Sequence, residues 1–141
     1  MNILILCTGN SCRSQMAHGW ISYFTKELDV FSAGTKPEEK VNTFAIKAMD
    51  SFGVDISTYS TNNVKEYESH NFDLVLTVCD KAKETCPVVF NTLEMKHKSF
   101  PDPVDYVGTD EEKLQHYIEV AVDLKKWIYE ILIEKGLIID N

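Results

Sequence analysis

Residues 3–14 have the sequence ILILCTGNSCRS, which joins a short apolar run to a polar loop containing one basic residue. A continuous apolar run bounded by a turn is typical of a strand buried on both faces of a parallel sheet. In an open parallel sheet, ligand sites lie beyond the carboxyl ends of the strands. The polar loop that follows this first strand is therefore the first place to look for chemistry.

Further apolar runs continue an alternation of strands and helices along the chain. The remaining predicted strands cover residues 30–33, 73–78 and 96–100, and the predicted helices cover residues 16–28, 44–52 and 114–132. The strands at residues 30–33 and 73–78 rest on mainly apolar runs, the strand at 96–100 is a weaker candidate, and the helices rest on apolar residues at helical spacing. Thr109 and Glu112 form a capping-box pattern before the last helix, and Gly136 marks its end. Strands alternating with helices predict an α/β fold with a parallel sheet.

The chain of 141 residues is expected to form a single domain, residues 1–141, because it has no repeat and no Pro-, Gly- or Ser-rich linker. Its 14 basic and 22 acidic residues give a net charge of −8, which argues against nucleic acid or a membrane surface as partner. No apolar run approaches the length of about 20 residues that a membrane helix needs, and the N-terminus lacks the basic region of a signal peptide. We therefore expect a cytoplasmic monomer whose anionic ligands are attracted by a local site.

The loop after the first strand has the composition of a cradle for an oxyanion. Five residues separate Cys7 from Arg13, enough to surround a tetrahedral anion with backbone N–H groups beside a helix N-terminus. Arg13 is expected to grip two oxygens of the anion, and the same surroundings are expected to lower the pKa of Cys7 and make it a nucleophile. Ser14 can donate a hydrogen bond to the Cys7 thiolate. The candidate oxyanion-binding residues are Thr8, Gly9, Asn10, Ser11, Cys12, Arg13 and Ser14.

Other interpretations of this loop are weaker. The chain contains neither G-x-x-x-x-G-K-[ST] nor G-x-G-x-x-G, so nucleotide binding has no support. A Cys-x5-Arg pattern also occurs by chance, in which case Cys7 is a buried inert residue and Arg13 a solvated one. Its position between a buried strand and a helix start favours the catalytic interpretation. For Cys12, filling space beneath the loop is favoured over a catalytic role.

Two further cysteines, Cys79 and Cys86, follow the third predicted strand. Two thiols that form one disulfide release two electrons, the number needed to reduce a bound pentavalent oxyanion, and a third thiol can move the disulfide outward by exchange. In a regular helix the Cα atoms of Cys79 and Cys86 would lie about 10.5 Å apart, so a disulfide between them requires this segment to unwind. Two ordinary half-buried cysteines, or a four-cysteine zinc site with wide spacing, are the alternatives.

A candidate proton donor, Asp102, stands between Pro101 and Pro103 after the fourth predicted strand. The prolines stiffen the loop, and a carboxylic acid there can protonate the oxygen that leaves a tetrahedral centre. On local sequence alone, a simple turn role for Asp102 and Asp105 is equally favoured. Asp102 is therefore a candidate general acid that needs support from elsewhere in the chain.

Together these residues resemble a known family. The segments that carry the resemblance are residues 7–17, 31–34, 53–57, 76–79, 86–87 and 102–103. In this combination they resemble the thioredoxin-coupled arsenate reductases, which are built on the low-molecular-weight protein tyrosine phosphatase fold. The resemblance covers nearly the whole chain and implies a three-layer αβα sandwich around a four-stranded parallel sheet.

The resemblance also implies a mechanism for arsenate as substrate. Cys7 attacks arsenate while Asp102 protonates the leaving oxygen. Cys79 then attacks the adduct with loss of arsenite, and Cys86 takes over the disulfide, which thioredoxin reduces. The alternative is a low-molecular-weight protein tyrosine phosphatase that acts through a Cys7 phosphocysteine with Asp102 as general acid, and both activities can coexist. A non-catalytic anion sensor or a zinc module is a third interpretation.

Some positions depart from the relatives that the resemblance suggests. Plain phosphatases of this fold usually have a proline where Gln15 stands, and Tyr106 lies three residues after Pro103 rather than in the usual place, so both positions favour the reductase. Some reductases hold potassium with an asparagine and an acidic residue, where this chain has Asn10 but His18, and no metal or cofactor is expected. The histidines share no metal-ligand spacing and are expected to be surface or packing residues: His18, His70, His97 and His116.

Overall fold

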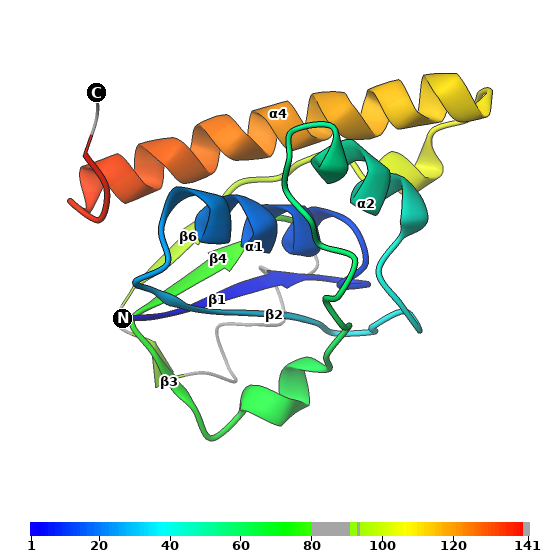
Figure 1. The fold of residues 1–141 in the computed structure, drawn as a ribbon. Helices are drawn as coiled ribbons and strands as arrows, with labels where there is room; N and C mark the ends of the chain where they lie inside the picture. Colours follow the sequence, from blue (N-terminus) through cyan, green and yellow to red (C-terminus); the bar gives the residue numbers. More distant parts are fainter. Residues whose placement is uncertain (80–90, 93, 140–141) are drawn as a thin grey trace.

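The computed structural model describes residues 1–79, 91–92 and 94–139. Its centre is a four-stranded sheet in which all neighbouring strands are parallel, in the order β2-β1-β4-β6 (Figure 1). The strands are β1 (Asn2–Cys7), β2 (Asp29–Gly34), β4 (Leu74–Thr77) and β6 (Met95–His97). The predicted α/β fold with a four-stranded parallel sheet is therefore confirmed.

Strand β1 lies between β2 and β4, and its apolar run is covered on both faces. Residues 3–6 are fully buried, and each such side chain contributes roughly 1.5–3 kcal/mol of hydrophobic stabilisation. Leu6 pairs with Ala33 of β2 on one side and with Thr77 of β4 on the other. The carboxyl ends of the three strands therefore meet at one edge of the sheet, where the loop after Cys7 begins.

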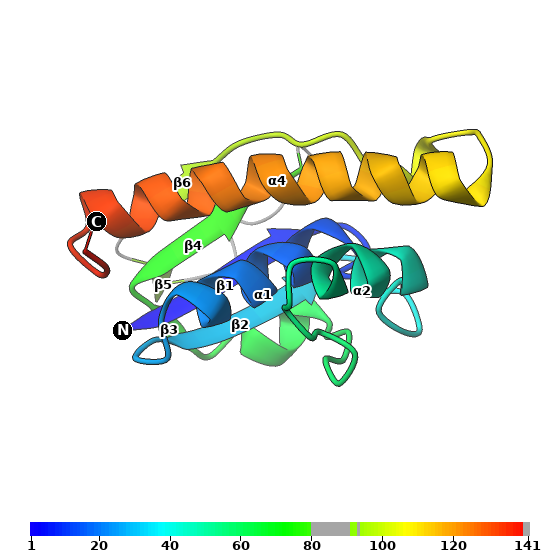
Figure 2. The same ribbon diagram turned by 45° about the horizontal axis from the view of Figure 1, so that its top comes forward.

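The described α-helices cover one face of the sheet, as Figures 1 and 2 show. They are α1 (Arg13–Phe24), α2 (Thr43–Asp50) and α4 (Asp110–Glu134). The opposite side carries the 3-10 helix η1 (Val64–Tyr67) and the parallel pair of β3 (Asn71–Phe72) with β5 (Asn91–Thr92), and the 3-10 helix η3 (Pro103–Asp105) precedes α4. None of the helices in the described ranges is long and apolar enough to cross a membrane.

The long helix α4 holds the helical layer together. It begins at the predicted capping box, in which Thr109 Oγ1 accepts from the Glu112 N–H while Glu112 Oε1 accepts from the Thr109 N–H. The chain leaves the helix near Gly136, whose φ is +69°. The Nε1–H of Trp20 in α1 donates to the Ala121 carbonyl oxygen at 2.9 Å. Because a buried indole N–H needs such a partner, this bond fixes how α1 packs on α4.

Predicted element boundaries differ from the structure by up to four residues, and two of the ends are informative. The helix expected over residues 16–28 ends at Phe24, after which the backbone becomes extended. The strand expected over residues 96–100 is β6, which ends at His97. Beyond β6, the Lys98 N–H still donates to the Thr77 carbonyl oxygen and the Phe100 N–H to that of Val78, whereas the next residue, Pro101, has no N–H to donate. Apolar periodicity located the helix, whereas the strand was a weaker candidate whose existence the structure confirms.

Gly34, at the end of β2, lets the loop after β1 pass close to the sheet. A Cβ atom at this position would lie 2.4 Å from the Thr8 carbonyl oxygen, which is closer than atoms can approach. The Gly34 N–H also donates to the Asn62 carbonyl oxygen at 2.9 Å, so the backbone is held in place. The absence of a side chain at Gly34 is therefore a condition for the path of the loop after Cys7.

Candidate active site

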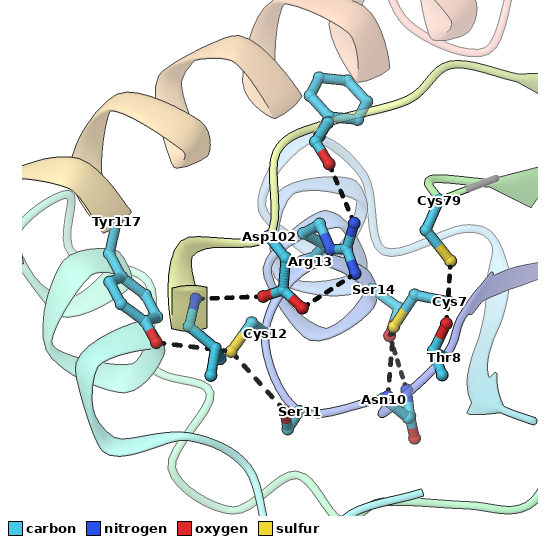
Figure 3. A network of polar contacts seen from close by, with 12 residues as sticks. Cys7, Thr8, Asn10, Ser11, Cys12, Arg13, Ser14, Cys79, Asp102 and Tyr117 are labelled. Carbon is cyan, nitrogen blue, oxygen red and sulfur yellow. Dashed lines mark hydrogen bonds and ion pairs between the residues drawn. The ribbon is translucent and has the colours of Figure 1, made fainter. Parts of the chain in front are cut away.

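The cradle loop, residues 8–12, connects β1 to α1 and curls around the Cys7 side chain (Figure 3). Asn10 adopts a left-handed backbone with φ of +51°, and its N–H donates to the Cys7 Sγ atom at 3.2 Å. Asparagine is one of the residues that tolerate this conformation. Cys7 is only 2% exposed. The loop thus directs a backbone donor at a sulfur atom that lies deep in the protein.

The Ser14 hydroxyl lies between Cys7 and Asn10. Its oxygen accepts a hydrogen bond from Asn10 Nδ2 at 2.8 Å and lies 3.0 Å from the Cys7 Sγ atom. Because the oxygen already accepts from Asn10, the hydroxyl proton is available to the sulfur. A hydrogen bond donated to sulfur favours the thiolate form.

Opposing effects act on the pKa of the Cys7 thiol. Burial raises this pKa, whereas the Ser14 hydroxyl and N–H, the charge of Arg13 and the Asn10 N–H lower it. Burial is the largest effect, so the pKa of Cys7 lies above its ordinary value, and the lowered pKa expected from the sequence is wrong for this geometry. The sequence pattern indicates the favourable donors, but it does not indicate how deeply the sulfur lies.

Arg13, the first residue of α1, turns its guanidinium toward the loop that follows β6 (Figure 3). Its Nη1 donates to the Phe100 carbonyl oxygen at 2.9 Å, and its Nη2 lies 3.4 Å from Asp102 Oδ2. The Arg13 side chain is 11% exposed and that of Asp102 is 37% exposed. The loop after β6 therefore meets the cradle loop through Arg13.

Local sequence explains the position of the Asp102 carboxylate. Asp102 is the N-cap of η3, and its Oδ1 accepts from the Val104 N–H at 3.1 Å. Pro103 occupies the first turn of η3, where its missing N–H costs nothing. One carboxylate oxygen therefore caps η3 while the other faces Arg13. The two roles that the sequence left open for Asp102, a turn residue and a site residue, are compatible.

A cavity of about 240 Å³ opens between the cradle loop and the Asp102 loop. Its lining includes Lys36 and Glu38, which the sequence analysis did not single out. The chain after β2 reaches the cavity because the Lys36 N–H donates to the Thr8 carbonyl oxygen at 2.9 Å and the Glu38 N–H to that of Gly9 at 2.8 Å. These are backbone hydrogen bonds between distant parts of the chain, and no local sequence pattern predicts them.

Cys79 lies just after β4 and is 6% exposed. Its sulfur lies 3.4 Å from Thr8 Oγ1 in the cradle loop (Figure 3). The parallel pairing of β1 with β4 explains this contact, because residues that follow two parallel strands leave the sheet at the same edge. Cys86, the other cysteine of the expected relay, lies outside the described residues. Within the described ranges, Cys7, Cys12 and Cys79 are free thiols.

Cys12 has different surroundings from Cys7. It is 4% exposed, and its sulfur lies 3.9 Å from the Tyr117 hydroxyl oxygen of α4 and 3.6 Å from Ser11 Oγ. Burial raises the pKa of the Cys12 thiol to about 11, so this thiol is protonated at neutral pH. Its side chain fills space between the cradle loop and α4.

Behind the cradle loop lies a group of buried polar residues that the sequence analysis missed as a group. Gln15 is fully buried and Ser32 is 2% exposed. His18 packs against Tyr59, with ring centroids 4.6 Å apart, and burial lowers the pKa of His18 to about 4. No sequence signal marks these two residues, because Gln15 and His18 lie opposite the apolar stripe of the helix, where exposed polar residues are expected. In the described part of the chain, no three side chains are grouped so that they could hold a metal ion.

Cysteine-based attack on a tetrahedral oxyanion is the chemistry that this geometry fits, because a thiol, its N–H donors, a guanidinium and a carboxyl group border one cavity. The fold and the site thus define a phosphatase-like enzyme. The chain belongs to the low molecular weight phosphotyrosine protein phosphatase family, which it matches over residues 2–132.

Some proteins similar to this chain are named arsenate reductases and others are named phosphatases. The chain is 42% identical over 127 residues to an arsenate reductase of Halalkalibacterium halodurans, with 89% of this chain and 91% of the relative covered. It is 43% identical over 123 residues to the arsenate reductase of Bacillus subtilis, covering 86% and 88% of the two chains. Among solved structures, a low molecular weight protein tyrosine phosphatase from T. tengcongensis has a TM-score of 0.74 and 27% identity, with 96% and 99% covered. An arsenate reductase in the phosphate binding state has a TM-score of 0.70 and 22% identity, with 94% and 97% covered.

Proposed function

We propose that this protein reduces arsenate to arsenite, with Cys7 as the nucleophile. The observation that carries the proposal is the buried thiol of Cys79, whose sulfur lies 3.4 Å from Thr8 in the loop that surrounds Cys7. A phosphatase needs one thiol at its cavity, whereas a reductase needs a second thiol within reach of the first. The relatives named arsenate reductase support the same activity.

The first step is a displacement at arsenic. The cradle loop and Arg13 hold the arsenate dianion, and the Cys7 sulfur forms an S–As bond while one As–O bond breaks. The leaving oxygen departs as water, with Asp102 as the acid that delivers its proton. The hydrogen arsenate dianion supplies the hydroxyl group of this water, Asp102 adds the second proton, and the proton of the Cys7 thiol restores the acid form of Asp102. The step is therefore balanced for a thiol whose pKa is raised by burial.

The second step reduces arsenic. The Cys79 sulfur attacks the Cys7 sulfur, an S–S bond forms, and the electron pair of the S–As bond passes to arsenic. Arsenic leaves as arsenite with the proton of the Cys79 thiol. Two thiols lose two electrons in all, and arsenic gains two in passing from the pentavalent to the trivalent state.

The third step restores Cys7. The Cys86 thiol attacks the Cys79 sulfur, which releases Cys7 and leaves a Cys79–Cys86 disulfide for thioredoxin to reduce. This step rests on the family resemblance, because Cys86 lies outside the described residues. The relay requires a reducing compartment, so we propose that the enzyme is cytoplasmic. We further propose that it is a single-domain monomer that uses no cofactor.

Disulfide mapping tests the relay directly. The reduced protein is treated with arsenate and alkylated, and its disulfides are identified by mass spectrometry. Wild type should form a Cys79–Cys86 disulfide, and Cys86→Ser should accumulate a Cys7–Cys79 disulfide after one equivalent of arsenite. Cys12→Ser changes a cysteine of the cradle loop that takes no part in the relay, and it should still form the Cys79–Cys86 disulfide because serine keeps the backbone N–H at that position. Absence of a Cys79–Cys86 disulfide in the wild type rejects the relay.

Hydrolysis of phosphate esters is a second candidate function, favoured by a separate observation. A hollow of about 610 Å³ adjoins the cavity and shares Ser11, Glu38 and Val104 with it. This space can take the organic part of an ester whose phosphate sits in the cradle loop. Cys79→Ser should leave the hydrolysis of an aryl phosphate intact while it stops arsenite production, because only reduction uses the second thiol.

A further inference from the structure

A row of polar side chains runs from His18 to the cradle loop and takes no part in the proposed chemistry. His18 Nδ1 lies 3.2 Å from Ser32 Oγ, and Ser32 Oγ lies 3.4 Å from Gln15 Oε1. At the other end of its amide, Gln15 Nε2 donates to the carbonyl oxygen of Asn10 at 2.9 Å and to that of Ser60 at 3.0 Å. The row thus joins α1, β2 and two loops behind the nucleophile.

The two carbonyl oxygens fix the orientation of the Gln15 amide. A carbonyl oxygen accepts hydrogen bonds and donates none, so the NH₂ end must face Asn10 and Ser60 and the oxygen end must face Ser32. The opposite orientation would bring acceptors together at a side chain that is fully buried. Gln15 is therefore a double donor toward the backbone and an acceptor for one hydroxyl group.

The same reasoning fixes the protons on Ser32 and His18. The single hydroxyl proton of Ser32 goes to Gln15 Oε1, because that oxygen cannot donate. His18 Nδ1 can then face the Ser32 oxygen favourably only as an N–H donor. Since burial lowers the pKa of His18 to about 4, its ring is neutral near pH 7 and the whole row is uncharged. The hydrogen bonds accordingly run in one direction, from His18 to Asn10.

We propose that Gln15 and His18 are positioning residues for Cys7, which through this directed row hold the Asn10 peptide in the left-handed conformation that aims its N–H at the sulfur. The inference rests on the proposed role of Cys7 as nucleophile. Asn10 gives its N–H to the Cys7 Sγ atom at 3.2 Å and its carbonyl oxygen to Gln15 at 2.9 Å. The nucleophile and the row therefore hold opposite ends of the same residue.

A second set of bonds ties the row to the segment of residues 60–62. The Asn62 N–H donates to Asn10 Oδ1 at 2.8 Å, and Asn62 Nδ2 donates to the Ser32 carbonyl oxygen at 3.2 Å. Asn10, Gln15 and Ser32 are at most 2% exposed, so water cannot replace a donor that is lost there. Loss of the Gln15 donors should therefore release Asn10 from residues 60–62 and change the contacts of the sulfur.

Gln15→Glu tests the proposal with almost no change in side-chain shape, because it replaces the double donor by a group that only accepts. The readouts are the rate of Cys7 alkylation by iodoacetamide between pH 5 and 9, quantified by peptide mass spectrometry, and the affinity for inorganic phosphate by calorimetry. We expect alkylation at pH 7 to slow about tenfold, phosphate to bind about tenfold more weakly, and the pH profile to move upward. Gln115→Glu, the same change at an exposed position of α4, is the matched control and should change none of these.

His18 provides an independent pair of variants. His18→Phe keeps a ring against Tyr59 but removes the N–H that Ser32 accepts, whereas His18→Asn loses the ring and keeps an N–H donor at the corresponding place. We expect His18→Phe to slow Cys7 alkylation several-fold and His18→Asn to stay within twofold of wild type. The opposite order, or equal alkylation rates with altered melting temperatures only, shows a purely structural role and overturns the proposal.

These readouts separate the two inferences. Alkylation and phosphate binding require no arsenate turnover, so they report on positioning even if the disulfide relay is rejected. Conversely, normal alkylation in both Gln15→Glu and His18→Phe rejects the positioning role while leaving arsenate reduction in place. If Gln15→Glu does not fold, the His18 pair decides the question alone.

Discussion

The two loops that face each other across the cavity are built in opposite ways. The cradle loop is held by buried hydrogen bonds, since Asn10 and Ser14 are fully buried and both contact Cys7. The loop that carries Asp102 lies at the surface, with Val104 54% and Val107 90% exposed. Under the proposed function, the more firmly held loop binds the anion and the more exposed loop transfers the proton.

Arg13 links these two loops. Its Nη2 lies 3.4 Å from Asp102 Oδ2, and an oxyanion gripped by the guanidinium competes with that carboxylate for the same N–H groups. In the proposed mechanism, binding of the substrate and orientation of the acid are therefore coupled through one side chain. Variants that act on only one loop should separate these two functions.

Arg13→Lys should have the largest effect, because it removes the guanidinium that links the cradle loop to the Asp102 loop. A lysine ammonium is a point charge that cannot grip two oxygens and also donate to the Phe100 carbonyl oxygen. We expect kcat/KM for arsenate and for an aryl phosphate to fall about 10²- to 10³-fold, measured by steady-state kinetics. A fall of less than fivefold would show that Arg13 contributes charge alone.

Asp102→Asn should act mainly on the exposed loop and lower kcat for an aryl phosphate about 10²-fold. Asparagine is also a good N-cap, so η3 should persist while the proton donor is lost. Binding of inorganic phosphate should be unchanged or tighter, because a carboxylate no longer competes for Arg13. Asp105→Asn, three residues along, is the control and should have wild-type kinetics. An unchanged kcat in Asp102→Asn would remove its role as acid.

The buried His18 side chain behind the cradle loop should make the free energy of unfolding depend on pH. Its pKa is lowered from 6.5 to about 4 by burial, so the unfolded chain takes up a proton before the folded one does. The contribution of neutral His18 to the free energy of unfolding should therefore be at its maximum above pH 7. It should fall by up to about 3 kcal/mol as the pH drops from 6.5 to 4. Urea unfolding of wild type and His18→Asn measures this contribution, with exposed His70→Asn as control. Parallel pH profiles for wild type and His18→Asn would contradict it.

Thr109→Ala should have the smallest effect, because Thr109 ends the exposed loop by capping α4. We expect a loss of about 1 kcal/mol in the free energy of unfolding, with Thr109→Ser close to wild type. Cys7 alkylation should not change in either variant, since the cap lies on the side that does not hold the sulfur. A slower alkylation in Thr109→Ala would mean that the two loops are less independent than their contacts indicate.

The sequence predicts the strand β1 and the cradle loop because both are local in the chain. A continuous apolar run specifies β1, and the spacing of Cys7 and Arg13 lies within one strand-to-helix connection. The parallel order of strands then predicts that Cys79 and Asp102 leave the sheet at the same edge. These are inferences from periodicity and from the geometry of parallel sheets.

The rest depends on contacts between distant parts of the chain. The row from His18 through Ser32 to Gln15 spans two elements, and each residue taken alone has an ordinary polar side chain. Lys36 and Glu38 reach the cavity through backbone N–H bonds that any residue type except proline can make. The raised pKa of Cys7 follows from burial, which only the packed structure defines.

Gly34 touches no anion and contributes no side chain, yet a Cβ atom there would collide with the Thr8 carbonyl oxygen. A library that diversifies the neighbours of Cys7 to obtain new oxyanion selectivity should therefore leave position 34 unchanged. Any other residue there would displace the backbone of the cradle loop before it altered a contact with the bound anion. Lys36 and Glu38, which line the cavity with their side chains, are the positions where such a library can vary the site without moving its frame.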